Sequence, residues 1–79
     1  MNTNPRQATA TLEVTGMTCD HCVASVKKEV GTLAGVDEVR VELVPGGVST
    51  VTVTSAYTLD ADQLAAAIDE AGYELAALR

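Results

Sequence analysis

The residues of this chain that are best suited to chemistry lie in one short segment, residues 17–22 (MTCDHC). It holds both cysteines, Cys19 and Cys22, and the only histidine, His21. Two cysteines separated by two residues bring two sulfur atoms to one point in space. Such a pair can bind a soft metal ion of low coordination number or form a redox-active disulfide. This segment is therefore the candidate site, and the flanking elements must position it.

The period of the apolar residues changes at this segment. Apolar residues alternate from Ala8 to Val14, as in a half-buried strand that Gly16 interrupts. From about residue 20 to 33 they recur at helical spacing, with Asp20 as the expected N-cap. The apolar stripe of this helix consists of Val23, Val26, Val30 and Leu33.

The cysteine pair therefore lies in a loop that opens into a helix N-terminus. Unpaired backbone N–H groups and the helix dipole favour anionic sulfur there. We expect Cys19 on the loop and Cys22 in the first helical turn, both converging toward solvent. Neither cysteine is expected to be needed for the core.

The second half of the chain repeats the order of strand and helix. Alternating residues around Val39 and Val41 predict a strand, residues 45–47 (PGG) a turn, and residues 49–54 the second strand of a hairpin. A second helix is expected after Asp60, with Gln63 as its capping-box partner. Its inner stripe would consist of Ala61, Leu64, Ile68 and Ala71, with Gly72 at its end and a closing strand over residues 73–78.

The two apolar stripes have the same pattern, displaced by 38 residues, so the chain reads as strand–helix–strand twice. Two right-handed split βαβ units packed together give an α+β fold of the ferredoxin-like βαββαβ type. It is a sandwich of a four-stranded antiparallel sheet with two helices on one face. We expect one such domain over residues 8–79, preceded by a flexible tail, residues 1–7.

Composition restricts the possible partners and compartments. Two cysteines cannot form the disulfide framework of a small secreted domain, and no segment resembles a secretion signal or reaches transmembrane length. These features predict a cytoplasmic chain with free thiols and no membrane insertion. Five basic residues against eleven acidic ones give a net charge of −6. Nucleic acid is not an expected partner, because binding it requires a basic patch.

The donor set favours Cu(I) among the metals. Zn(II) normally takes four ligands, whereas two thiolates suit a soft ion of low coordination number. The open positions of an exposed two-sulfur site would let a partner's thiolate enter before the first bond breaks, so the metal could be handed on. A protein that only buffers metal is an alternative.

Thiol–disulfide chemistry is the main rival interpretation. Thioredoxin-like proteins, however, are longer and carry a cis-proline beside the thiols. The prolines of this chain are Pro5 in the tail and Pro45 in a hairpin that we expect to be distant from the cysteines. The rival is therefore less favoured.

Residues 16–22 (GMTCDHC) resemble the Gly-Met-Thr-Cys-x-x-Cys signature of the heavy-metal-associated domain family. The resemblance extends to residues 71–73 (AGY) and covers nearly all of the chain from Thr9 to Leu78. The family includes CopZ-type bacterial copper chaperones and N-terminal domains of copper-transporting P-type ATPases. The resemblance implies the ferredoxin-like fold, Cu(I) bound by Cys19 and Cys22, and transfer through intermediates with shared ligands.

A cytosolic copper chaperone that is not an enzyme follows as the expected function, with a copper-transporting P-type ATPase as its partner. Ag(I) or Zn(II) would bind more weakly, and a second copy of the chain could form a copper-bridged homodimer. The alternative within the family is an excised ATPase domain. The start at Met1 and a unit complete by Leu78 favour a free-standing protein.

Four further residues near the cysteines have expected roles. Met17 should pack inward and anchor the loop, and Thr18 should cap the helix or hydrogen bond to loop amides. His21 could supply an imidazole to copper but is expected to be solvated. Tyr73 matches the family position facing the metal. It could donate its hydroxyl to a cysteine sulfur or simply pack at the edge of the core.

Overall fold

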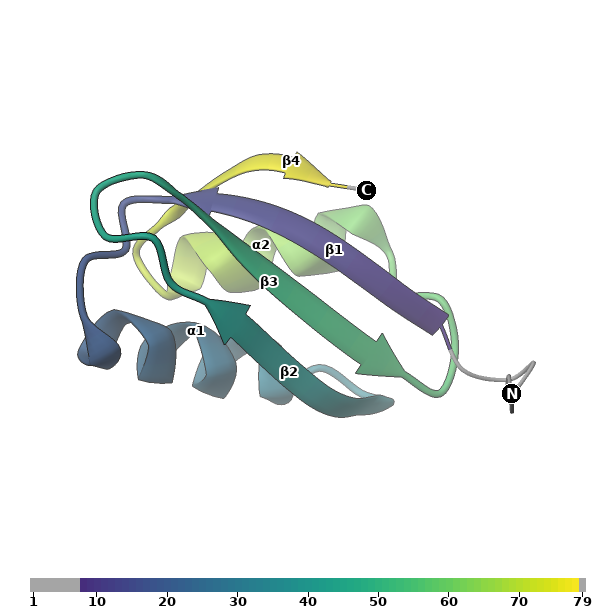
Figure 1. Cartoon of the computed structure of the whole chain (residues 1–79). Helices are drawn as coiled ribbons and strands as arrows, with labels where there is room; N and C mark the ends of the chain where they lie inside the picture. Colours follow the sequence, from purple (N-terminus) through teal and green to yellow (C-terminus); the bar gives the residue numbers. More distant parts are fainter. Residues whose placement is uncertain (1–7, 79) are drawn as a thin grey trace, which may run out of the picture.

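The structure is a computed structural model that describes residues 8–78; the tail predicted over residues 1–7 lies outside the described residues. The elements follow the order β1 (Ala8–Thr15), α1 (Asp20–Gly31), β2 (Val36–Glu42), β3 (Val48–Ser55), α2 (Ala61–Glu70) and β4 (Glu74–Leu78). The strands form one antiparallel sheet in the order β2-β3-β1-β4. Both helices lie on one face of it (Figure 1). The predicted ferredoxin-like βαββαβ fold is confirmed.

The core lies between the helices and the inner face of the sheet. Its fully buried side chains include Leu12, Val14, Val26, Val30, Val51, Val53, Leu64 and Ile68. Strand residues enter it with a period of two, and helix residues enter it at spacings of three and four. Alternation and helical periodicity in the sequence therefore located most of this core.

Three members of the predicted stripes are placed differently. Val23 is only half-buried and is not part of the core cluster, which contains its neighbour Cys22 instead. Ala61 is exposed, because it is the first residue of α2, and Ala67 faces the core instead. Ala67 lies three residues after Leu64 and therefore on the same side of the helix. In α1 the helix ends at Gly31, so Leu33 packs against the core from the following loop.

The ends of α2 follow the predicted capping pattern. The Asp62 N–H donates to Asp60 Oδ1 at 3.0 Å, and the Asp60 N–H donates to Gln63 Oε1 at 3.4 Å, so a capping box starts the helix. At the other end, the Gly72 N–H donates to the Asp69 carbonyl and the Tyr73 N–H to the Ile68 carbonyl, at 2.9 and 3.2 Å. These paired bonds form a Schellman motif, which fixes the direction in which Tyr73 leaves the helix.

The start of α1 differs from the prediction, because Cys19 and not Asp20 occupies the N-cap position. Cys19 has an extended backbone, and its carbonyl accepts hydrogen bonds from the N–H groups of Cys22 and Val23 at 3.0 and 3.3 Å. Asp20 is already the first helical residue, and the N-cap side chain makes no capping hydrogen bond. The side chain at the N-cap position is therefore a thiol, whereas most helices have a side chain with an oxygen atom there.

Three connections meet at one end of the molecule (Figure 1): the β1–α1 loop, the β2–β3 turn and the α2–β4 loop. The sheet register requires this, since Thr15 at the end of β1 pairs with Val48 at the start of β3. The Gly46 N–H donates to the Met17 carbonyl at 3.2 Å. Pro45 was expected to be distant from the cysteines, and this expectation was wrong.

No helix within residues 8–78 is long and apolar enough to cross a membrane.

Candidate metal centre

The two cysteines lie side by side at this end but differ in exposure. Both are free thiols, Cys19 exposed and Cys22 buried, with their Sγ atoms 3.9 Å apart. The sequence placed both near solvent and outside the core, which is wrong for Cys22. Its side chain is only 9% exposed and belongs to the core cluster. Cys22 lies four residues before Val26 and eight before Val30, on the same helix face, and this spacing could have predicted its burial.

The separation of the sulfur atoms suits a shared metal ion. With metal–sulfur bonds of about 2.3 Å, a linear S–metal–S unit would separate the sulfurs by about 4.6 Å and a tetrahedral angle by about 3.8 Å. The observed distance of 3.9 Å between the two sulfur atoms is thus compatible with a bent S–metal–S unit, which leaves room for a third ligand on the metal. Within residues 8–78 no group of three or more His, Cys, Asp or Glu side chains is arranged to hold a metal. His21 and Asp20 are both exposed.

The sulfur of Cys22 is surrounded by groups of three neighbouring residues. The Thr18 N–H donates to Cys22 Sγ at 3.4 Å, and the Thr18 hydroxyl lies 3.7 Å from the same atom. Thr18 therefore contacts the sulfur directly, whereas the sequence suggested loop amides. Hydrogen bonds from the Thr18 backbone first, then from the Tyr73 hydroxyl and the Cys19 backbone, lower the pKa of the Cys22 thiol to about 6. Each of these donors favours the thiolate, and together they outweigh the burial that would raise the pKa.

Tyr73 combines the two roles proposed for it from the sequence. Its half-buried ring packs against the core, and its hydroxyl is one of the groups that lower the pKa of the Cys22 thiol. The pKa of Tyr73 is raised, because that hydroxyl hydrogen bonds to the Cys22 sulfur and is partly desolvated. A Cβ atom at Gly16 would lie 3.4 Å from the Tyr73 ring, and Gly16 has a φ of +99°. A glycine there lets the loop turn beneath the ring without backbone strain.

Met17 anchors the loop from below, as predicted. Its side chain is fully buried in the core, while its carbonyl accepts the Gly46 N–H. The cysteine loop is thus fixed by a buried side chain at Met17 and by helix α1 at Cys19. Such a fixed loop holds the sulfurs close together before any metal binds.

We expect the Cys22 thiol of the reduced, metal-free protein to titrate near pH 6, since its hydrogen bonds lower the pKa to about 6. The titration can be followed by thiolate absorbance in a Cys19→Ala variant. Tyr73→Phe removes one donor and should raise this pKa, whereas Tyr57→Phe should not. Tyr57 is the matched control, because its hydroxyl donates to the Ala34 carbonyl at 3.0 Å.

The same shift predicts how stability depends on pH. The pKa of Cys22 in the folded state is lower than the ordinary value of 9.0, so the thiolate favours folding. Its contribution to the free energy of unfolding is complete above pH 9 and is lost as the pH falls through about 6. In the titration experiment described above, an unchanged pKa of Cys22 in Tyr73→Phe would show that the tyrosine does not stabilise the thiolate.

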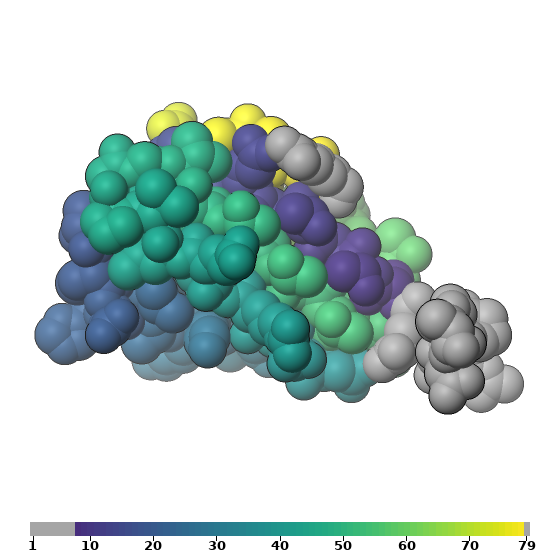
Figure 2. Space-filling view, in the orientation of Figure 1, coloured from purple at the N-terminus to yellow at the C-terminus, as the bar shows by residue number. Residues whose placement is uncertain are grey.

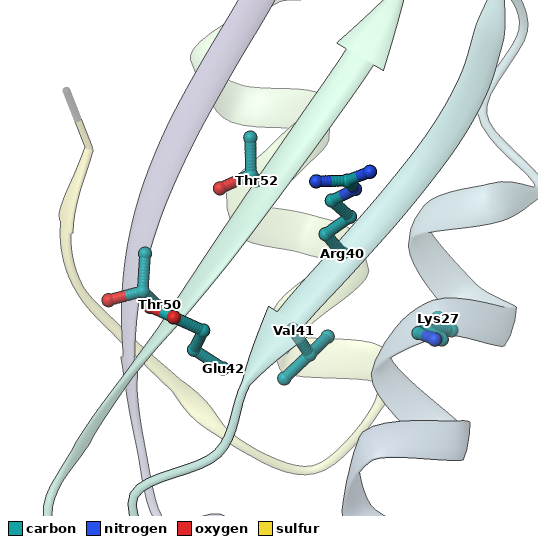
Figure 3. A pocket seen from close by; sticks show the side chains of 6 residues that line it. All are labelled: Lys27, Arg40, Val41, Glu42, Thr50 and Thr52. Atoms are coloured by element: carbon teal, nitrogen blue, oxygen red, sulfur yellow. The ribbon is translucent and has the colours of Figure 1, made fainter.

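A hollow of about 550 Å³ lies away from the cysteines, around the edge strand β2 (Figure 3). It is lined by Lys27, Arg40, Val41, Glu42, Thr50 and Thr52. None of these is a cysteine or histidine, so the hollow offers a soft metal no ligand of either kind. Lys27 and its neighbour Lys28 are exposed on the outer side of α1.

The sequence profile of the heavy-metal-associated domain family matches residues 11–74. The chain belongs to this family. The match runs from within β1 to the first residue of β4, so it includes the whole cysteine loop, both helices and Tyr73. As a heavy-metal-associated domain, the chain is a metal-associated module and not an enzyme.

Relatives of this heavy-metal-associated domain occur in two contexts. The copper chaperone CopZ of Bacillus subtilis is 41% identical over 71 residues, which cover 84% of this chain and 93% of CopZ. Copper-transporting ATPase 2 of Rhizobium meliloti is 42% identical over 71 residues, which cover 90% of this chain but only 8% of the ATPase. A solved structure named as a CopZ metallochaperone has a TM-score of 0.72 and 30% identity, covering 86% of this chain and 98% of its own.

Proposed function

We propose that this domain is a cytoplasmic copper chaperone that binds Cu(I) through Cys19 and Cys22 and delivers it to a copper-transporting P-type ATPase. The observation that carries the proposal is the geometry of the pair. Two free sulfurs lie 3.9 Å apart, and the hydrogen bonds that lower the pKa of Cys22 to about 6 keep one of them a thiolate at neutral pH. Soft Cu(I) binds well to such a pair, and soft Ag(I) should bind to the same pair more weakly.

The unequal exposure of the cysteines suggests an order for delivery. Cys19 is exposed, so an incoming thiolate can reach a metal from its side. Cys22 is buried and hydrogen bonded, and it would hold the metal while the partner's first bond forms. Such a sequence keeps the cargo bound to at least two sulfurs at every stage. Neither His21 nor Tyr73 is needed as a ligand in this scheme.

The relatives support this function and supply the second candidate. CopZ of Bacillus subtilis is named as a copper chaperone and is matched over 93% of its length. The match within Copper-transporting ATPase 2 of Rhizobium meliloti favours, as the second candidate, a metal-binding domain of such an ATPase. An antibody raised against the domain distinguishes the two in host extracts. A free-standing chaperone would be detected near 8.2 kDa, and an ATPase domain as part of a far larger protein.

We expect the copper-loaded protein to stimulate ATP hydrolysis by the host's copper-transporting P-type ATPase in lipid vesicles. The stimulation should exceed that given by the same free Cu(I) concentration buffered by a small chelator, because docking delivers the metal directly. The Cys19→Ala/Cys22→Ala variant is the control and should add nothing to the chelator alone. Equal stimulation by protein and chelator would show that the domain only buffers copper.

A second copy of the chain is a further proposed partner, bridged through the open coordination positions of the metal. Each copy carries a net charge of −6, which opposes association at low salt and is screened at high salt. The homodimer should therefore require copper and strengthen with ionic strength, as sedimentation of the loaded protein would show.

A further inference from the structure

The β2–β3 turn presents an apolar, uncharged surface beside the cysteine loop. Val44, Pro45 and Val48, here called the turn patch, are all exposed, with Val44 at 48% and Val48 at 46%. Residues 43–49 (LVPGGVS) contain no charge, although the chain as a whole has a net charge of −6. Figure 2 shows the teal residues of the turn standing out at the same end as the blue residues of the loop and α1. Exposed apolar side chains that gather beside a site indicate contact with another molecule.

The turn patch is held rigidly. The Gly47 N–H donates to the Val44 carbonyl at 3.0 Å, and Gly46 has a φ of +75°, as in a type II turn with Pro45 at its second position. The hydroxyl of Ser49 is fully buried beneath it. It accepts the Val44 N–H at 2.9 Å and faces the Val44 carbonyl at 3.4 Å, to which it donates. A rigid backbone lowers the entropy that docking would cost.

The turn patch is also joined to the cysteine loop. The Gly46 N–H donates to the Met17 carbonyl at 3.2 Å, and Val48 pairs with Thr15 at the end of β1. Met17 lies two residues before Cys19, the exposed cysteine. A partner whose own thiolate comes within about 2.3 Å of a metal on Cys19 must bring its surface against this end of the domain. The turn patch then lies in or beside the contact.

We propose that the turn patch is a docking surface for the protein that receives copper, and that it binds an apolar, uncharged rim around the partner's thiolates. This inference rests on the proposed function. Burial of Val44 and Val48 would supply binding energy without opposite charges, which suits a chain whose net charge would repel an acidic partner. Docking of this kind should depend only weakly on salt.

The experiment measures stimulation of the host's P-type ATPase as a function of the concentration of copper-loaded protein. Val44→Ser/Val48→Ser should raise the half-saturating concentration roughly tenfold, because two apolar side chains lose their burial in the complex. Leu78→Ser is the matched control and should leave the concentration unchanged. Leu78 is also an exposed large apolar residue, but it pairs with Leu12, three residues before Thr15, and so lies away from the cysteine end of the sheet.

Copper affinity, measured by competition with a chelator, separates docking from metal binding. It should agree within about twofold among the three proteins, since the turn patch contributes no ligand. If the unsubstituted protein stimulates the ATPase and the double variant does so at the same concentration, the docking proposal is wrong and the proposed function stands. If the unsubstituted protein gives no more stimulation than the chelator, both proposals fail. A double variant that loses copper affinity would also contradict docking, since the turn would then act through the site.

Discussion

Replacing Cys19 and Cys22 together with serine is expected to abolish measurable competition for Cu(I) against a strong chelator. A hydroxyl is a hard, weakly acidic donor and cannot replace a thiolate for a soft ion. The loss should be well over the roughly 100-fold that follows when a residue that only supports a ligand is changed. Ala24→Ser, an exposed substitution on the same helix, is the matched control and should bind normally.

The single variants should differ in their effect on the fold. Cys19→Ser changes an exposed N-cap side chain to one that can cap α1 and should not lower the unfolding temperature, whereas Cys22→Ser replaces a buried core thiol and should lower it. Copper affinity of the unsubstituted protein should fall as the pH drops below about 6, because protons then compete for Cys22. A double variant that still competes with the chelator would place the site elsewhere and refute the proposed function.

Zinc is expected to bind more weakly than Cu(I) by several orders of magnitude. Zn(II) prefers four ligands in a tetrahedron, and within residues 8–78 no third His, Cys, Asp or Glu side chain joins Cys19 and Cys22. Competition of each metal against a chelator selective for it gives the two affinities. The preference for copper should also persist in His21→Ala, because His21 is exposed and is not needed for two-sulfur binding.

A comparable affinity for zinc would contradict this prediction. It would mean that His21 or Asp20 turns toward the cysteines when the metal binds. His21→Ala would then remove zinc binding and spare copper, and the matched variant His21→Asn would behave in the same way. Unchanged zinc binding in both variants would leave Asp20 as the additional ligand.

The sequence by itself determined the fold and the location of the candidate site. Alternation over residues 8–14 and helical spacing at Val26 and Val30 are local properties, and a strand or helix with one apolar face can bury it in few ways. The capping box at Asp60 and Gln63 also acts within one helical turn, so residue types alone revealed it. The spacing of Cys19 and Cys22 predicted two sulfurs at one point for the same reason.

Only the tertiary structure decided how the two cysteines differ. Whether Cys22 is buried depends on α1 packing against the sheet. Its pKa is lowered first by the nearby Thr18 backbone and then further by Tyr73, which is 51 residues away in the chain. The hydrogen bond between Gly46 and Met17 likewise depends on the pairing of β1 with β3. These contacts join segments that are distant in sequence, and local patterns carry no information about which of the distant segments will meet. The local sequence brings the two sulfur atoms together. The packing of the helix against the sheet leaves the Cys19 sulfur exposed and makes the Cys22 sulfur buried and hydrogen bonded.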